Sequence, residues 1–336
     1  MGKVTRILIV HQGAIGDFIL SLPAIGSFRH HYPGAEVEIW GYPEILKLVE
    51  KKFYADRIGS IDRKEIASFY NERAVLDSEL VACFKRFDLI IIFGGEQQQP
   101  LVRTLEKIQV KEVKSISTFP PSADSIHVVD YQLSQLVSLG YKVPDTIPQL
   151  FPSESDRAQA IDLFSQRGIG KDTLTVAVHI GSGSRNKTWP ASSFAQLSEK
   201  LIKGSAAHIM LLIGPADEEV AEEYFNLIDS RSVTTLANLP LGQLPAVLTQ
   251  CDLYLGNDSG ITHLAAAVGT PVVALFGPTD PRVWGPRGND VSIVYKALEC
   301  SPCSREEMKG CTHRKCLQEI SVDEVYGKIK SIIKVR

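Results

Sequence analysis

Residues 253–276 read LYLGNDSGITHLAAAVGTPVVALF. Short apolar runs of strand length stand at both ends, and a helix-length segment that stops at Gly269 lies between them. Asp258 or Ser259 can cap this helix, while Gly260 permits close approach to the backbone. A strand, a helix and a second strand in this order predict a right-handed crossover between two strands of a parallel sheet.

The same alternation of strand-length and helix-length segments extends along both halves of the 336-residue chain. A proline-rich stretch at 141–156 with little periodicity predicts a linker. We therefore expect an α/β protein with two domains, residues 1–150 and 151–336, a parallel sheet in each and the working site in a cleft between them. The expected strands are 6–11, 36–40, 89–93, 113–117, 174–179, 208–213, 253–256 and 271–276; expected helices span 15–31 and 131–139 or begin at Ala191, Glu218, Leu241 and Gly260.

Charge and hydropathy argue against two classes of protein. Lys and Arg number 36 against 39 Asp and Glu, a formal net charge of −3, whereas bulk nucleic-acid binding needs a basic field. No apolar run approaches the roughly 18 residues of a membrane span, and the run at 7–10 is too short for the core of a signal peptide. We expect a soluble, cytoplasmic protein with no nucleic-acid partner.

In open parallel sheets ligands bind at the carboxyl ends of the strands, so the loops that follow the strands are the candidate site. One of these loops places Asp258 and Ser259 before a helix N-terminus, whose N–H groups and partial positive charge favour phosphate. His263 in the first turn could donate to that phosphate. The alternative is that Asp258 only caps the helix and His263 is a surface residue. In the second half the loops are 181–190, 214–219, 256–263 and 276–281.

The loop GSGSRNKT, residues 181–188, nearly matches the phosphate-binding pattern G-x-x-x-x-G-K-T, but Asn186 replaces the second glycine. Pro190 indicates a helix that begins later than the helix of such a loop. We therefore reject nucleotide hydrolysis and interpret Lys187 as a phosphate contact, with a solvated lysine as the alternative.

In the first half, HQGAIGDF at residues 11–18 lacks the G-x-G-x-x-G spacing, so a nicotinamide site is weakly supported. Asp17 begins a helix, where the helix dipole stabilises a carboxylate. The functional alternative for Asp17 is a general base aimed into the cleft.

Four of the six cysteines crowd into CSPCSREEMKGCTHRKC, residues 300–316. In a cytosolic chain this cluster indicates a metal clip more than disulfides, because four thiolates suit tetrahedral zinc or iron. Four reduced thiols in a loop are the alternative. The residues concerned are Cys300, Cys303, Cys311 and Cys316.

Together, the motifs GAIGDFILSLPAI, HIGSGSRNKTWP, GPADEE and NDSGITHLAAAVGTPVVALFGPTDP, with the terminal cysteine segment, resemble the heptosyltransferases of lipopolysaccharide synthesis, glycosyltransferase family 9. The motifs follow in order over nearly the whole chain. The resemblance implies the glycosyltransferase B fold of two Rossmann-like domains, the first for the acceptor and the second for a nucleotide sugar, typically ADP-heptose. We expect the last helix to pack back on the first domain.

The resemblance also implies site residues and a reaction. Asp17 matches the catalytic base and Lys187 the pyrophosphate lysine. The reaction is inverting transfer of heptose to a lipid A–Kdo acceptor, with no cofactor required because the protein's own cations replace Mg²⁺. The acceptor-side loop falls on Gly13, Ala14 and Gly16; the donor contacts fall on Ser182, Gly183 and Lys187, on Glu218 for the ribose, on Leu239 for the adenine, and on Asp258, Ser259, Gly260 and His263 for the diphosphate.

Two alternative functions stay open: a related glycosyltransferase that uses another nucleotide sugar, and a non-catalytic two-domain protein that binds nucleotide sugars. The sequence also departs from some family members, since Ala14 stands where others carry a hydroxyl and the loop before Lys187 is one residue longer. The exact donor sugar and the acceptor position therefore stay open. A lipid acceptor would bring peripheral contact with the cytoplasmic face of the inner membrane.

Overall fold

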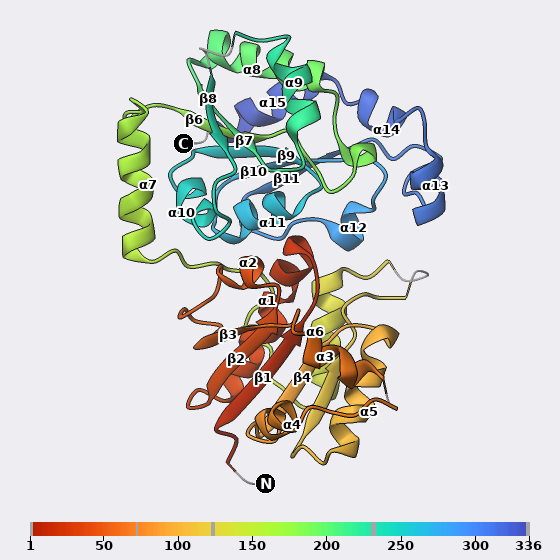
Figure 1. Ribbon diagram of the computed structural model, residues 1–336. Coiled ribbons are helices and arrows are strands. Elements are labelled where there is room, and N and C mark those ends of the chain that lie inside the picture. Colours follow the sequence, from red (N-terminus) through yellow and green to blue (C-terminus); the bar gives the residue numbers. More distant parts are fainter. Residues whose placement is uncertain (1–2, 72, 122–124, 230–232, 334–336) are drawn as a thin grey trace. The chain divides into compact units, whose positions relative to one another are not determined.

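The computed structural model describes residues 3–71, 73–121, 125–229 and 233–333. The chain divides into two compact units, Met1–Phe151 and Pro152–Arg336, one residue away from the boundary expected from the sequence (Figure 1). Each unit contains one parallel sheet with helices on both of its faces. The units are therefore α/β and Rossmann-like, as the sequence predicts.

The first unit has five strands in the order β3-β2-β1-β4-β5. The central strand β1 pairs in parallel with β2 and β4, so that Ile9 lies between Ile39 and Ile91. Helix α1 packs on α6, while α5 packs on β5 and η1. The strands are β1 Arg6–His11, β2 Glu36–Gly41, β3 Arg57–Ser60, β4 Leu89–Phe93 and β5 Val113–Ile116; the helices are α1 Ile15–His31, α2 Pro43–Leu46, α3 Lys64–Ala67, η1 Ser68–Tyr70, α4 Ser78–Phe84, η2 Glu96–Gln98, α5 Gln99–Lys107 and α6 Val128–Ser138.

The second unit has six strands in the order β11-β10-β9-β6-β7-β8, all parallel. Helix α8 packs on α9 and α15, and α10 packs on α7 and α11 (Figure 1). The strands are β6 Thr175–His179, β7 His208–Ile213, β8 Val233–Ala237, β9 Leu253–Asn257, β10 Val272–Phe276 and β11 Val291–Tyr295; the helices are α7 Glu154–Gln166, η3 Arg185–Lys187, α8 Ala191–Ser205, α9 Glu218–Phe225, α10 Leu244–Leu248, α11 Gly260–Ala267, α12 Pro281–Trp284, α13 Arg305–Gly310, α14 Lys315–Gln318 and α15 Val322–Ile333.

Every strand predicted from the sequence is present, within one residue at either end. Three further strands, β3, β8 and β11, were missed, and each lies at an edge of its sheet. Most of their residues are half-buried or exposed, and each strand has polar residues or glycine among its apolar ones, so none of them forms a continuous apolar run. An edge strand has a neighbour on one side only, and polar residues are tolerated there.

Three helix boundaries are corrected. Helix α6 begins at Val128 rather than at residue 131. The last three residues of the expected linker, 154–156, already belong to α7. Ser153 begins this helix as its cap and accepts from Asp156 N at 3.1 Å. Helix α10 begins at Leu244 rather than at Leu241. The last helix, α15, buries Val325 in the core of the second unit. Its packing on the first domain stays a prediction.

In the described part of the chain, no helix is both long enough and apolar enough to span a membrane.

Candidate active site

The candidate site of the second unit is built from the loops that follow β6, β7, β9 and β10. Because these four strands are parallel neighbours, their carboxyl ends meet at one edge of the sheet. Strand β6 lies beside β9, with His179 opposite Gly256. The loops 180–190 and 258–263 are therefore adjacent, although they are far apart in the sequence.

Lys187 lies at the centre of this edge. Lys187 is the last residue of the single turn η3, which Ser184 caps by accepting from Asn186 N at 3.3 Å. Lys187 Nζ lies 2.8 Å from Asp258 Oδ2, and the Lys187 side chain is 24% exposed against 8% for Asp258. A lysine held by a buried carboxylate at the mouth of a site can exchange that partner for a phosphate oxygen.

Asp258 is fixed by two further contacts. Thr279 Oγ1, from the loop after β10, donates to Asp258 Oδ2 at 2.6 Å. Ser182 Oγ, from the loop after β6, donates to the Asp258 carbonyl oxygen at 2.8 Å. Three loops thus converge on one aspartate, and the predicted residues Ser182, Lys187 and Asp258 are in direct contact.

The turn after Asp258 is the N-terminus of α11. Ser259 caps the helix by accepting from Thr262 N at 3.4 Å. Gly260 opens the first turn, where backbone N–H groups lack acceptors within the helix and favour an anion. His263 lies in the same turn and is buried, so the alternative of a surface histidine is wrong.

Asn257 is a site residue that the sequence analysis missed. It is fully buried at the end of β9, and its Nδ2 donates to the carbonyl oxygens of Ile180 and Gly181 at 2.9 and 3.0 Å. Its Oδ1 accepts from Trp189 N at 2.9 Å. One amide therefore ties both ends of the lysine loop to β9. The signal in the sequence was a polar residue that directly follows a buried apolar run.

The other predicted donor contacts lie outside the hydrogen-bonded group around Asp258 in the described residues. Glu218 is the first residue of α9 and is exposed, and Gly183 is exposed in the lysine loop. Leu239 is half-buried after β8 and lines a pocket of about 190 Å³ together with residues of α7 and α10. Their roles towards ribose and adenine stay predictions.

A larger pocket, of about 440 Å³, lies beside the lysine loop. Ser182 and Asp217 line one side of it, and the beginning of α8 and residues of α9 line the rest. Arg185 also lines the pocket, with Nη1 2.5 Å from Glu219 Oε1 and Nη2 2.6 Å from Glu223 Oε1. The pocket is thus adjacent to the predicted donor contacts.

In the first unit, the carboxylate of Asp17 folds back on the start of its own helix. Asp17 Oδ2 accepts from Ala14 N at 3.2 Å, and Ser21 Oγ donates to the Asp17 carbonyl oxygen. Gly13 donates its N–H to Nδ1 of the buried His11 at 3.1 Å. A Cβ atom on Gly13 would lie 2.6 Å from His11 Cε1, so only glycine fits there.

The acceptor-side loop therefore has a defined shape. Ala14 precedes α1 and is exposed, and Gly16 is half-buried in the first turn beside Asp17. The capping role of Asp17 is shown, whereas its role as a base is a prediction that this geometry leaves open, because the side chain is only half-buried.

The four clustered cysteines are free thiols around one pocket of about 370 Å³, which His313 also lines. Cys303 Sγ donates to the Cys300 carbonyl oxygen at 3.0 Å, and Cys316 packs into the apolar core. Burial, together with the other three thiols, raises the pKa of Cys316 to about 11. Among the described residues no three His, Cys, Asp or Glu side chains are arranged to hold a metal ion. The structure thus gathers the thiols without the arrangement expected of a metal clip.

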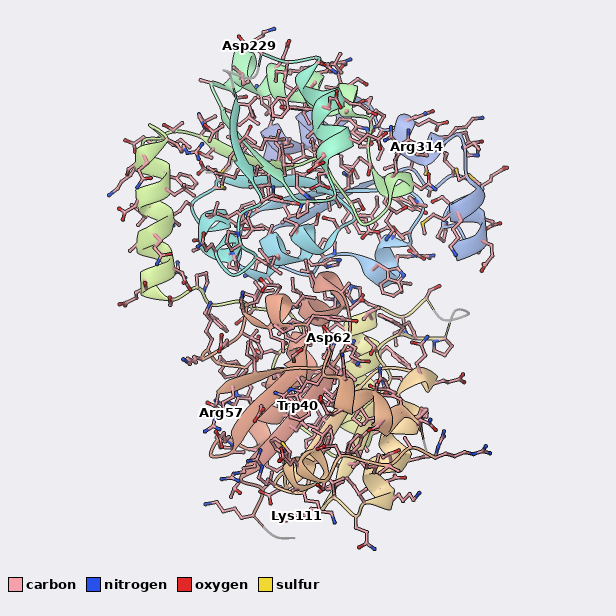
Figure 2. All side chains as sticks on the ribbon, viewed as in Figure 1. Trp40, Arg57, Asp62, Lys111, Asp229 and Arg314 are labelled. Carbon is pink, nitrogen blue, oxygen red and sulfur yellow. The ribbon has the colours of Figure 1, made fainter. Side chains whose placement is uncertain are left out.

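This cysteine segment, residues 300–316, packs on the lysine loop. Asn186 Nδ2 donates to the Met308 carbonyl oxygen at 2.6 Å. Arg314, labelled in Figure 2, donates from Nη1 to the Arg185 carbonyl oxygen at 3.2 Å. The segment therefore supports the turn that carries Lys187.

Two Rossmann-like units, one with a lysine–aspartate pair before a helix N-terminus, define an α/β protein of the kind that binds phosphorylated ligands at a sheet edge. A family model described as glycosyltransferase family 9 (heptosyltransferase) matches residues 114–313. The chain belongs to this family and is a glycosyltransferase.

Similar proteins match over nearly the full length. The chain is 31% identical to lipooligosaccharide heptosyltransferase 2 of Campylobacter jejuni, over 95% of this chain and 96% of that protein. Among solved structures, a glycosyltransferase family 9 protein of Veillonella parvula aligns with a TM-score of 0.83 and 22% identity, covering 100% and 99% of the two chains. The ADP-heptose lipopolysaccharide heptosyltransferase II of Escherichia coli aligns with a TM-score of 0.75 and 17% identity, covering 98% of each chain. Both structures share the fold of this chain.

Proposed function

We propose that this chain is an inverting glycosyltransferase that moves heptose from ADP-heptose to the inner core of lipopolysaccharide, at the cytoplasmic face of the inner membrane. The family supports this activity, and so does the Campylobacter relative, which is named a lipooligosaccharide heptosyltransferase. The observation that carries the proposal is the pair of Lys187 and Asp258 at the first turn of α11.

In this proposal the second unit holds the donor. Lys187 leaves Asp258 to contact the diphosphate, and the first-turn N–H groups of α11 bind its other oxygens, with His263 beside them. These groups stabilise the charge that develops on ADP as the bond to the sugar breaks, so no metal or other cofactor is needed for the chemistry. Ser182 and Gly183 contact the donor from the lysine loop, Glu218 binds the ribose, and Leu239 lines the adenine.

The first unit holds the acceptor, a lipid A–Kdo precursor, in the loop of Gly13, Ala14 and Gly16. Asp17 removes the proton from the attacking hydroxyl. The hydroxyl oxygen bonds to the anomeric carbon as the carbon–oxygen bond to the diphosphate breaks, and the electron pair leaves with ADP. Attack on the face opposite the leaving group inverts the anomeric centre.

The proposal is tested by measuring which nucleotide the protein binds most tightly and then whether it transfers the sugar to the acceptor. Calorimetry with ADP, UDP and GDP should show the tightest binding for ADP, and ADP-heptose should glycosylate a lipid A–Kdo acceptor. Equal or tighter binding of UDP or GDP would favour a glycosyltransferase with another nucleotide sugar. Tight ADP binding without any transfer would favour a non-catalytic binding protein.

A zinc or iron clip at Cys300, Cys303, Cys311 and Cys316 is a separate proposal about the fold. The donor type supports it, because four thiols and His313 line one pocket. Elemental analysis of protein purified without chelator should find about one equivalent of metal, as four thiolates in one tetrahedral site require. A protein that contains only a trace of zinc and iron but still unfolds cooperatively would contradict the metal clip. The four cysteines would then be reduced thiols without a metal.

A further inference from the structure

His179 closes β6 at its carboxyl end and is 6% exposed. Its imidazole lies between side chains from two other loops. Nε2 is 3.2 Å from Asp217 Oδ2, and Nδ1 is 3.4 Å from Ser259 Oγ. Asp217 precedes α9 and Ser259 precedes α11. One histidine therefore joins the loops that follow β6, β7 and β9.

The contacts of Asp217 fix where the protons of His179 lie. Burial would raise the pKa of Asp217, but the hydrogen bonds that its carboxylate accepts from His179 and from the N–H of Gly214, at 2.7 Å, hold the pKa below its ordinary value. Asp217 is thus a carboxylate at neutral pH and can only accept. His179 Nε2 therefore donates to this carboxylate, and in the ring with one proton Nδ1 is the acceptor.

This tautomer orients the hydroxyl of Ser259. Ser259 Oγ lies 3.4 Å from His179 Nδ1 and 3.1 Å from Thr262 Oγ1, and it accepts from Thr262 N at 3.4 Å. The neighbouring hydroxyl of Thr262 donates to the Asn257 carbonyl oxygen at 2.5 Å and contacts the Tyr254 hydroxyl at 3.1 Å. The capping oxygen is therefore held by His179 and Thr262, and the first N–H groups of the turn, at Gly260 and Ile261, are the ones that can bind an anion.

Asp217 is buried against the lysine loop. A Cβ atom on Gly181 would lie 1.7 Å from Asp217 Oδ1, so the carboxylate packs directly against the backbone at the start of the lysine loop. The side chains of His179 and Asp217 are 8% and 6% exposed, in contrast to the mobile ion pairs of a surface.

We propose that His179 is a positioning residue for the diphosphate of the donor, acting through Ser259 and Asp217; this deepens the proposed function and rests on it. Donor contacts come from three loops: Ser182 and Lys187 from the first, Glu218 from the second, and the turn at Gly260 from the third. A displacement of about 1 Å among such groups is enough to reduce binding and rate strongly. His179 fixes the positions of the three loops relative to one another through its contacts with Asp217 and Ser259.

The test is a double-mutant cycle on ADP affinity with His179→Gln, Ser259→Ala and the double variant. Glutamine can still donate to Asp217 but has no acceptor at the position of Nδ1. We expect His179→Gln to weaken ADP binding about tenfold, and the double variant to bind no more weakly than the weaker single variant, because residues in contact couple.

The matched control is His208→Gln. His208 also pairs with a hydroxyl, Thr234 Oγ1 at 2.9 Å, but it begins β7 at the opposite edge of the same sheet. ADP affinity should not change in this variant. Unchanged ADP affinity in a folded His179→Gln protein, or losses that multiply fully in the double variant, would overturn the inference.

A second measurement uses the unsubstituted chain. Nitrogen-15 NMR of the imidazole should show His179 protonated at Nε2, and the Nδ1 shift should move when ADP is added. A ring protonated at Nδ1, or an Nδ1 shift that ADP leaves in place, would overturn the inference even if the variants do not fold. A wild-type chain that does not bind ADP at all would overturn the proposed function itself, which is a distinguishable result.

Discussion

Lys187 and Asp258 lie 71 residues apart in the sequence, yet Lys187 Nζ is 2.8 Å from Asp258 Oδ2. The same carboxylate oxygen accepts from Thr279. These contacts order the lysine side chain at the edge of the sheet. In the proposed function, little side-chain entropy is then lost when the lysine exchanges Asp258 for an oxygen of the diphosphate. Preorganisation of this kind raises affinity by lowering the cost of association.

Lys187→Ala should weaken ADP binding by about ten- to a hundredfold, the equivalent of one charge-assisted hydrogen bond of roughly 1.5–3 kcal/mol. Calorimetry on the folded variant measures this loss. The matched control is Lys200→Ala, which removes a half-buried lysine of α8 that pairs with Asp323 in the same unit. An unchanged dissociation constant for Lys187→Ala would remove Lys187 from the donor site.

Asp17→Asn should lower turnover by about 10²–10⁴, the usual contribution of general-base catalysis, while ADP affinity stays the same. Asparagine keeps an oxygen that can accept from Ala14 N, so the start of α1 is retained. The assay is transfer of heptose to a lipid A–Kdo precursor, with ADP titration of the same variant.

The control for Asp17 is Asp77→Asn, since Asp77 also caps a helix of the first unit by accepting from Leu80 N at 2.8 Å. Turnover of this control should match the wild type. Near-normal turnover of Asp17→Asn would eliminate Asp17 as the base. Loss of both turnover and ADP binding would mean that Asp17 acts only as a structural cap.

Much of the fold follows from the sequence because the central strands are buried on both faces. Strands β1, β4, β6, β9 and β10 are almost entirely buried, and such strands appear as short apolar runs between turn residues. The edge strands β3, β8 and β11 have no such run. A search for apolar runs in the sequence therefore could not identify these three edge strands.

The contacts of the site depend on strand order, which periodicity does not give. Strand β6 pairs with β9, a strand that follows it only after β7 and β8. The pairs of Lys187 with Asp258 and of His179 with Ser259 both cross this junction. The loops themselves single out Lys187 and Ser259 as candidate site residues, whereas His179, at the end of an apolar run, carries no local signal.

Asn257→Ala should lower the free energy of unfolding by about 2–4 kcal/mol, because it leaves the carbonyl oxygens of Ile180 and Gly181 and the N–H of Trp189 buried without their partner. Denaturant unfolding measures the change. The exposed Asn226→Ala, at the end of α9, is the control and should stay within about 0.5 kcal/mol of the wild type. A loss as small as that of the control would show that backbone and water replace these bonds.

Acid should destabilise the protein through His11. Burial lowers the pKa of His11 to about 4, against an ordinary value of 6.5, so the unfolded chain binds the proton first. Stability from this group is fully present above pH 6.5 and is lost as the pH falls from there through 4. The loss is at most about 3 kcal/mol, since a tenfold difference in proton affinity between the folded and unfolded chains corresponds to about 1.4 kcal/mol. The structural reason is that His11 Nδ1 accepts from Gly13 N and Nε2 donates to Ser21 Oγ at 3.1 Å, so a second ring proton would break the first bond.

The measurement for His11 is the free energy of unfolding of wild type and His11→Gln between about pH 7.5 and 4.5, a range that spans most of this titration. Glutamine does not titrate, so the difference between the two proteins should shrink as the pH falls. His30→Gln is the control, because His30 is exposed on the same helix and pairs with Asp145 at 3.4 Å. A difference between wild type and His11→Gln that is constant over this range would show that His11 does not contribute to the acid sensitivity of the first unit.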